Sequence, residues 1–239
     1  MNRYAFLLFL SLSLSLVSCN SDKKKTSSIV QKSTLQKQKI ASSGTWDFED
    51  VPLGKLPQGW QTDNKDLWHV GKDQTAPSGG QVLTMTDAEQ SFELFGGGFN
   101  LTWADTNTIS FLDGEITVKF KALSGEIDQG GGIVWRVQDS ENYYVARFNP
   151  LEDNFRIYTV KKGSRSQLLS ATIKLQNGEW HEMLIRQHAN NFEGYLDGKQ
   201  ILQGDDDTFT DAGGVGLWTK ADAVTSFDDF TVQDLIKKE

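Results

Sequence analysis

The sequence predicts an all-β protein built as an antiparallel β-sandwich or jelly roll. Apolar residues alternate with a period of two, as in Ile116, Val118 and Phe120, which is the pattern of strands with one buried face. Glycine-rich and Asp/Asn-rich turn signals recur at short intervals, among 22 glycines and only four prolines. No window shows a sustained helical period. Many short strands separated by such turns favour two packed sheets.

The first segment, residues 1–18, is expected to be a signal peptide. Arg3 precedes an apolar run over residues 5–17 that is too short for a membrane span of about 20 residues. The run ends in Leu-Val-Ser followed by Cys19, which resembles the lipobox of bacterial lipoproteins. The resemblance implies cleavage before Cys19, its acylation with lipid such as palmitate, and anchoring in the bacterial cell envelope, most readily at the outer membrane.

The second segment, residues 19–44, is expected to be a flexible tether, and residues 45–239 a single domain. The tether has no aromatic residue and is rich in Lys, Ser, Thr and Gln, so it cannot bury enough surface to offset its ordering entropy. The domain has 17 Lys and Arg residues against 31 Asp and Glu residues, which argues against nucleic acid as a partner. Cys19 is the chain's one cysteine, so no internal disulfide forms.

Strands and hairpins can be placed along this domain. The aromatic and acidic segments at 45–50 and 226–233 are expected to pair as terminal strands. Asp197-Gly198 separates two short strands and predicts a type I′ hairpin turn. The preceding turn is expected at Asn190-Asn191.

Strand parity divides the residues 130–160 between two faces of one sheet. If Ile133, Trp135 and Val137 point into the core, Arg136 points to the other face. The same alternation in the next strands places cationic, aromatic and amide side chains together on that outer face. The expected ligand-binding set is Arg136, Tyr143, Arg147, Asn149, Arg156, Tyr158, Trp218 and Lys220. Glu126 and Asp128 are interpreted as residues of the loop before this sheet.

Segments such as "GGGIVWR", "NYYVARFNPLEDNFRIY" and "YLDGKQIL" resemble the concanavalin A-like, laminin-G-like jelly rolls of secreted bacterial proteins. Within that group they are most similar to the 3-keto-disaccharide hydrolase domain, over about residues 46–232. The resemblance implies a carbohydrate ligand. Better-matched members carry Tyr-Glu-x-Gln in the second strand, where this chain has Tyr144, Val145, Ala146 and Arg147.

Two functions follow from these observations. Aromatic rings stack on sugar rings and guanidinium groups donate paired hydrogen bonds to carboxylates, so the outer face favours a glycan, and its basic excess favours an acidic one. The first hypothesis is therefore a lipid-anchored carbohydrate-binding or accessory protein of a bacterial polysaccharide-utilisation system. A structural envelope protein, with this face covered by a partner, is a further alternative.

The alternative function is a 3-keto-glycoside hydrolase or lyase acting on oxidised disaccharides. Such a reaction needs a general base near the sugar, and the candidates are Glu152, His181 and Asp222. A structural Ca²⁺ is also a hypothesis, because carboxylates gather where the terminal strands should pair. Its ligands would be Asp47, Glu49, Asp228 and Asp229.

Overall fold

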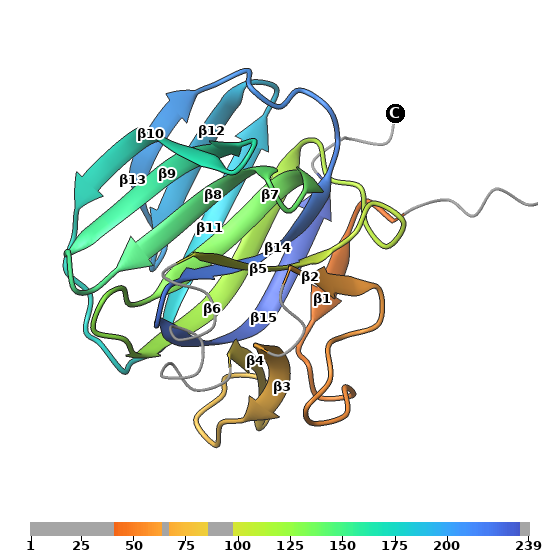
Figure 1. The fold of residues 1–239 in the computed structure, drawn as a ribbon, viewed down its shortest axis with the longest axis vertical. Helices are drawn as coiled ribbons and strands as arrows, with labels where there is room; N and C mark the ends of the chain where they lie inside the picture. The colour runs from red at the N-terminus through yellow and green to blue at the C-terminus, as the bar shows by residue number, and fades with distance from the viewer. Residues whose placement is uncertain (1–40, 64–66, 86–97, 235–239) are drawn as a thin grey trace, which may run out of the picture. The chain divides into compact units, whose positions relative to one another are not determined.

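A computed structural model describes residues 41–63, 67–85 and 98–234, which form fifteen β-strands and no helix. Among these residues there is accordingly no helix that could cross a membrane. The strands form two antiparallel sheets, one of eight and one of seven strands. The predicted β-sandwich is confirmed (Figure 1).

The eight-stranded sheet has the order β13-β12-β11-β6-β15-β4-β3, with β1 paired to β15. Its strands are β1 (Gly44–Trp46), β3 (Trp68–Lys72), β4 (Gln81–Met85), β6 (Gly114–Ser124), β11 (His181–His188), β12 (Asn191–Leu196), β13 (Lys199–Asp205) and β15 (Val224–Asp234).

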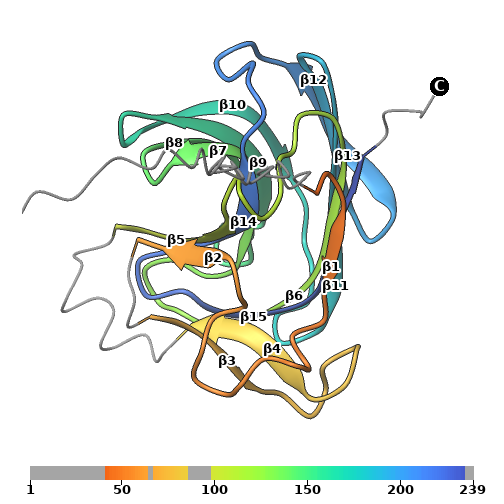
Figure 2. The same cartoon turned by 90° about the vertical axis from the view of Figure 1, so that its right-hand side faces the viewer.

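The seven-stranded sheet has the order β10-β9-β8-β7-β14-β5-β2. Its strands are β2 (Trp60–Thr62), β5 (Phe99–Ala104), β7 (Gly131–Asp139), β8 (Asn142–Asn149), β9 (Asn154–Lys161), β10 (Ser164–Thr172) and β14 (Gly214–Lys220). Figure 2 shows the eight-stranded sheet curving around one side of the seven-stranded sheet. The face of the seven-stranded sheet that points away from the other sheet is called the outer face below.

The terminal strands and one hairpin follow the sequence prediction, whereas the other hairpin is shifted by one residue. Trp46 lies opposite Phe230 in the β1–β15 pair. Asp197 and Gly198 both have positive φ, as a type I′ turn requires. The preceding turn lies at Ala189-Asn190 rather than Asn190-Asn191, because His188 pairs directly with Asn191.

The main core lies between the sheets and confirms most of the strand parity. Ile133 and Trp135 of β7 point inward, as do Tyr144 and Ala146 of β8, and all four are fully buried. The Trp135 indole donates a hydrogen bond of 2.8 Å to the Gln187 side chain on β11, so the one polar atom of this large ring is satisfied across the two sheets.

Arg136 departs from the predicted parity because it forms a β-bulge. Trp135 lies opposite Val215 and Val137 opposite Gly214, so Arg136 is an extra residue with a φ of 48°. The bulge turns Val137 to the outer face and Arg136 away from it. The prediction that Arg136 belongs to the outer-face ligand set is therefore wrong.

Arg136 instead joins the loops at one end of the sandwich. Its guanidinium is 1% exposed and donates to the carbonyls of Leu112, Phe209 and Ala189 at 3.0, 2.7 and 2.7 Å. Asp113 lies 3.3 Å from the same group. Burial lowers the pKa of Arg136, and Asp113 opposes this effect.

Candidate functional site

The outer face of the seven-stranded sheet has an apolar centre. Val134, Tyr143, Val145, Tyr158 and Trp218 pack together there, as parity predicts. Tyr143 and Trp218, however, have no exposed surface, and the Trp218 indole donates to the Tyr143 hydroxyl at 3.2 Å. The expectation that these two rings offer open stacking faces is wrong, because both are buried within the apolar centre.

A group of charged side chains borders this apolar centre. We call it the cationic cluster: Asp128, Arg147, Glu152, Arg156, Arg165 and Lys220. It joins strands β8, β9, β10 and β14 to the loop before β7. Four cations face two carboxylates, so the cluster is positive although the whole chain has a net charge of −8.

Arg147 and Arg156 lie directly opposite each other on β8 and β9. Like charges in this register repel each other, and Glu152 in the turn between the strands compensates. Its Oε2 accepts from Arg147 at 3.1 Å, from Arg156 at 3.0 Å and from the Asn154 amide at 2.7 Å. The Asn154 amide and the two arginines lower the pKa of Glu152 against the opposing effect of burial.

Asp128 balances the buried side of the cluster. Its carboxylate lies 3.0 Å from the Lys220 ammonium and 3.5 Å from the Arg147 guanidinium, and it accepts from the Asn149 amide at 2.7 Å. Asn149 is itself buried, and its Oδ1 accepts from the backbone N–H groups of Leu151 and Glu152. Asn149 therefore shapes the β8–β9 turn.

Two arginines of the cluster retain buried donors without an acceptor. Nε and Nη1 of Arg147 and Nη1 of Arg165 have no hydrogen-bond partner in the described chain. The contact between Arg147 Nη1 and Asp128 is an ion pair at 3.5 Å without hydrogen-bond geometry. The two guanidinium groups approach the same Tyr158 ring, at 5.9 and 4.4 Å from its centroid. Because buried donors are normally satisfied, this pair is suited to an anionic acceptor from outside the chain.

Asp128 and Arg165 were absent from the sequence-predicted ligand set. Arg165 could have been predicted from the Lys162-Gly163 turn that precedes it. Both turn residues have positive φ, as a tight hairpin requires. The hairpin pairs Arg165 with Val160, which shares the face of Tyr158. Asp128 lies in a loop, where alternation gives no orientation. Its contacts depend on how this loop folds against β8 and β14.

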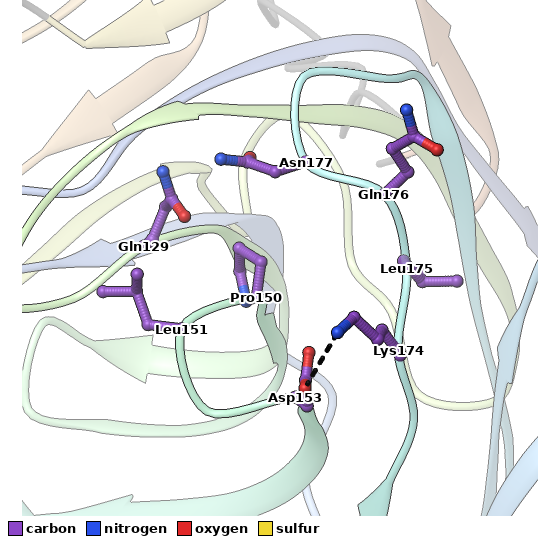
Figure 3. A pocket seen from close by; sticks show the side chains of 8 residues that line it. All are labelled: Gln129, Pro150, Leu151, Asp153, Lys174, Leu175, Gln176 and Asn177. Carbon is purple, nitrogen blue, oxygen red and sulfur yellow. Dashed lines mark ion pairs between the residues drawn. The ribbon is translucent and has the colours of Figure 1, made fainter.

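A hollow of about 700 Å³ lies at the β8–β9 turn, which also carries Glu152 of the cationic cluster (Figure 3). Pro150, Leu151 and Asp153 of the β8–β9 turn face it, across from Lys174 and Gln176. Lys174 and Asp153 form an ion pair of 3.9 Å. The turn thus contributes Glu152 to the cluster and Pro150, Leu151 and Asp153 to the hollow.

The three candidate catalytic residues are not brought together. Glu152 belongs to the cluster, whereas His181 lies on β11 of the other sheet and its two ring nitrogens contact Asp197 and the Gln176 carbonyl at 2.8 and 2.9 Å. Asp222 accepts from the backbone N–H groups of Glu126, Ile127 and Asp128 at 2.6, 3.0 and 2.9 Å.

The contacts of Asp222 and Glu152 indicate a structural role for both carboxylates. Burial opposes a lower pKa for Asp222, but the N–H groups of the loop prevail and keep its carboxyl ionised. Asp222 thereby holds the loop that carries Asp128. Glu152 has a lowered pKa as well, so neither carboxylate has the raised basicity of a general base.

The carboxylates proposed as calcium ligands bind protein donors. Asp228 is fully buried and accepts from the Ser78 amide and hydroxyl at 2.9 and 2.7 Å. Glu49 accepts from the N–H groups of Gly80 and Gln81, and Asp47 from that of Glu49. Burial and the neighbouring Asp228 raise the pKa of Asp229. Within the described ranges no three His, Cys, Asp or Glu side chains gather as a metal site, so the arrangement offers no support for calcium.

Comparison with known proteins establishes the fold of the chain but assigns it to no family. No family model matches the chain, and no curated protein matches it by sequence. A carbohydrate-binding module, CBM66 from Bacillus subtilis, is similar with a TM-score of 0.57 at 18% identity, over 73% of this chain and 96% of that one.

Two further solved structures are similar. The carbohydrate recognition domain of Emp47p has a TM-score of 0.51 at 18% identity, over 79% of this chain and 92% of that one. A xylan β-1,4-xylosidase from Bacillus halodurans has a TM-score of 0.54 at 16% identity, over 79% of this chain and 39% of that one. At these identities the likeness establishes a jelly-roll fold shared with carbohydrate-binding and glycosidase domains.

Proposed function

We propose that this protein binds an acidic glycan through the cationic cluster on its outer face. The observation that carries the proposal is the pair Arg147 and Arg165 near Tyr158, whose buried donors lack acceptors, and Arg165 is the partly exposed member of the pair. A sugar carboxylate or sulfate would supply those acceptors. Arg156 and Lys220 are partly exposed and add positive charge at the rim.

The jelly-roll fold supports a carbohydrate ligand in general, and the charge of the cluster supports an acidic one. The hollow at the β8–β9 turn gives room for neighbouring sugar units. Binding is favoured over 3-keto-glycoside cleavage because Glu152, Asp222 and His181 are each held by other groups.

We further propose that the protein is a lipoprotein of the cell envelope that serves a polysaccharide-utilisation system. Cys19, the proposed acylation site, lies outside the described residues, as do the signal peptide and most of the tether. Mass spectrometry of the membrane fraction should detect diacylglycerol on Cys19, and a Cys19→Ala variant should be released from membranes.

Replacing Arg165 by alanine should weaken binding of acidic oligosaccharides by about 10- to 100-fold, because a hydrogen bond to a charged group contributes about 1.5–3 kcal/mol. Isothermal titration with uronate, sulfated and neutral oligosaccharides measures this loss and separates carboxylate from sulfate. Arg186→Ala is the matched control, since Arg186 lies on the eight-stranded sheet and pairs with Glu115 and Glu193. Absence of heat with every acidic glycan, or equal affinity of Arg165→Ala and wild type, would refute the proposal.

A further inference from the structure

A second hollow lies on the outer face, at the opposite end of β14 from the cationic cluster. Its volume is about 370 Å³, within the range of small-ligand pockets, and it is formed by β2, the end of β5 and the β7–β8 turn. Trp103 on β5 pairs with Gly216, whereas Lys220 of the cluster is four residues further along β14. That separation is about 13 Å along a strand.

The Trp103 indole lies against a sheet position that has no side chain. A Cβ at Gly214 would come within 3.0 Å of Trp103 Cδ1, and one at Gly216 within 2.7 Å of its Cβ. The missing side chain at Gly214 lets the indole ring pack against β14, and Gly216 lets the backbone of β5 approach closely. The ring is partly exposed, unlike that of Trp218. Trp103 therefore offers a partly exposed aromatic surface to the hollow.

Amide side chains beside the ring are held in place by Asp105. Its Oδ2 accepts from the Gln61 amide at 2.7 Å and from the Asn107 amide at 3.4 Å, while its Oδ1 accepts from the Thr108 N–H at 3.0 Å. Burial opposes a low pKa for Asp105, but the donors of Gln61, Asn107 and Thr108 prevail. Asp105 is thus a fixed anion that orients Gln61 and Asn107, leaving each amide an oxygen that can accept.

The opposite wall carries Gln138 and Asp139. One oxygen of Asp139 accepts from the Glu141 N–H at 2.8 Å and from the Asn142 amide at 2.7 Å. Its second oxygen can accept from a ligand hydroxyl. The lining contains two carboxylates and no Lys or Arg.

We infer that this hollow binds a neutral pyranose unit, stacked on Trp103 and hydrogen-bonded by Gln61, Asn107 and Asp139. Aromatic rings take the C–H face of a sugar, and carboxylates accept strong hydrogen bonds from hydroxyls. The two acidic walls repel a uronate or a sulfate, so this site differs in specificity from the cationic cluster. It does not require the cluster to bind anything.

Titration of the full chain with neutral oligosaccharides of glucose, xylose, mannose and galactose, followed by tryptophan fluorescence and calorimetry, tests the inference. We expect saturable binding of at least one series, weakened at least 10-fold in Trp103→Ala and unchanged in Arg165→Ala. Trp180→Ala is the matched control, because Trp180 is a partly exposed tryptophan that bonds Thr75 outside the hollow.

Because Trp103 also packs against the outer-face apolar centre, two variants at the rim accompany it. Asn107→Ala and Asp139→Asn should each weaken the same ligand at least threefold. No binding of any neutral series, or full affinity in the folded Trp103→Ala or in both rim variants, overturns the inference. If the wild-type protein binds a neutral series but no acidic glycan, the result contradicts the proposed role of the cationic cluster and leaves this inference standing.

Discussion

Replacing Arg136 by alanine is expected to lower the free energy of unfolding by about 3–5 kcal/mol, the range for removing one partner of a buried charged contact. Its guanidinium satisfies the carbonyls of Leu112, Phe209 and Ala189 and faces Asp113. Alanine would remove this donor from the Leu112 and Phe209 carbonyls, whereas the Ala189 carbonyl would keep its hydrogen bond of 2.8 Å from the Gln187 amide. Chemical denaturation followed by circular dichroism measures the change.

Arg136→Lys separates charge from geometry in this prediction. Lysine retains the positive charge but cannot reach three carbonyls with a planar fork, so most of the loss should remain. Arg186→Ala, which removes partly exposed ion pairs, should cost less than about 1 kcal/mol. Equal unfolding free energies for Arg136→Ala and Arg186→Ala would contradict the structural assignment of Arg136.

Replacing Asp128 by alanine is expected to cost a similar amount, about 3–5 kcal/mol, because it leaves Arg147 and Lys220 without their shared carboxylate. Thermal and denaturant unfolding of the variant measure the loss.

Asp128→Asn is the companion variant, since it keeps an oxygen for the Asn149 amide while removing the charge. It should fall between wild type and Asp128→Ala in stability. It should also bind acidic glycans at least as tightly as wild type, because the cluster loses a competing anion. A wild-type unfolding curve for Asp128→Ala would show that the ion pairs of this carboxylate contribute nothing.

Alternation placed Tyr143, Arg147, Arg156 and Tyr158 on one face of the sheet because strand side chains obey a period of two wherever the ladder is regular. The rule failed at Arg136, where one extra residue with positive φ resets the alternation. Arginine is not a residue that marks a bulge, and the partner glycine Gly214 is equally compatible with a regular strand. The bulge depends on contacts with three loops distant in sequence.

The sequence predicted which face of the sheet carries the candidate site and that the site is positively charged, but not which of its side chains are buried. Parity cannot tell a covered position from an open one, so Trp218 and Tyr143 were assigned stacking roles although both are buried. Conversely, Trp103 lies partly exposed beside Gly214 and Gly216, and its environment depends on strands β5 and β14 being neighbours. Whether these rings are buried or exposed depends on pairings between strands that are distant in the chain, and a single sequence does not show those pairings.

The central claim is that the cationic cluster recognises the negative charge of a glycan. It is tested most directly by titrating the wild-type protein with an acidic oligosaccharide and with the same oligosaccharide after its carboxyl groups are reduced to alcohols. Binding of the acidic form should be at least 10-fold tighter, and the difference should shrink as salt rises and screens the exposed charges of Arg156 and Lys220. Equal affinity for the two forms, or tighter binding of the reduced form, would contradict the claim.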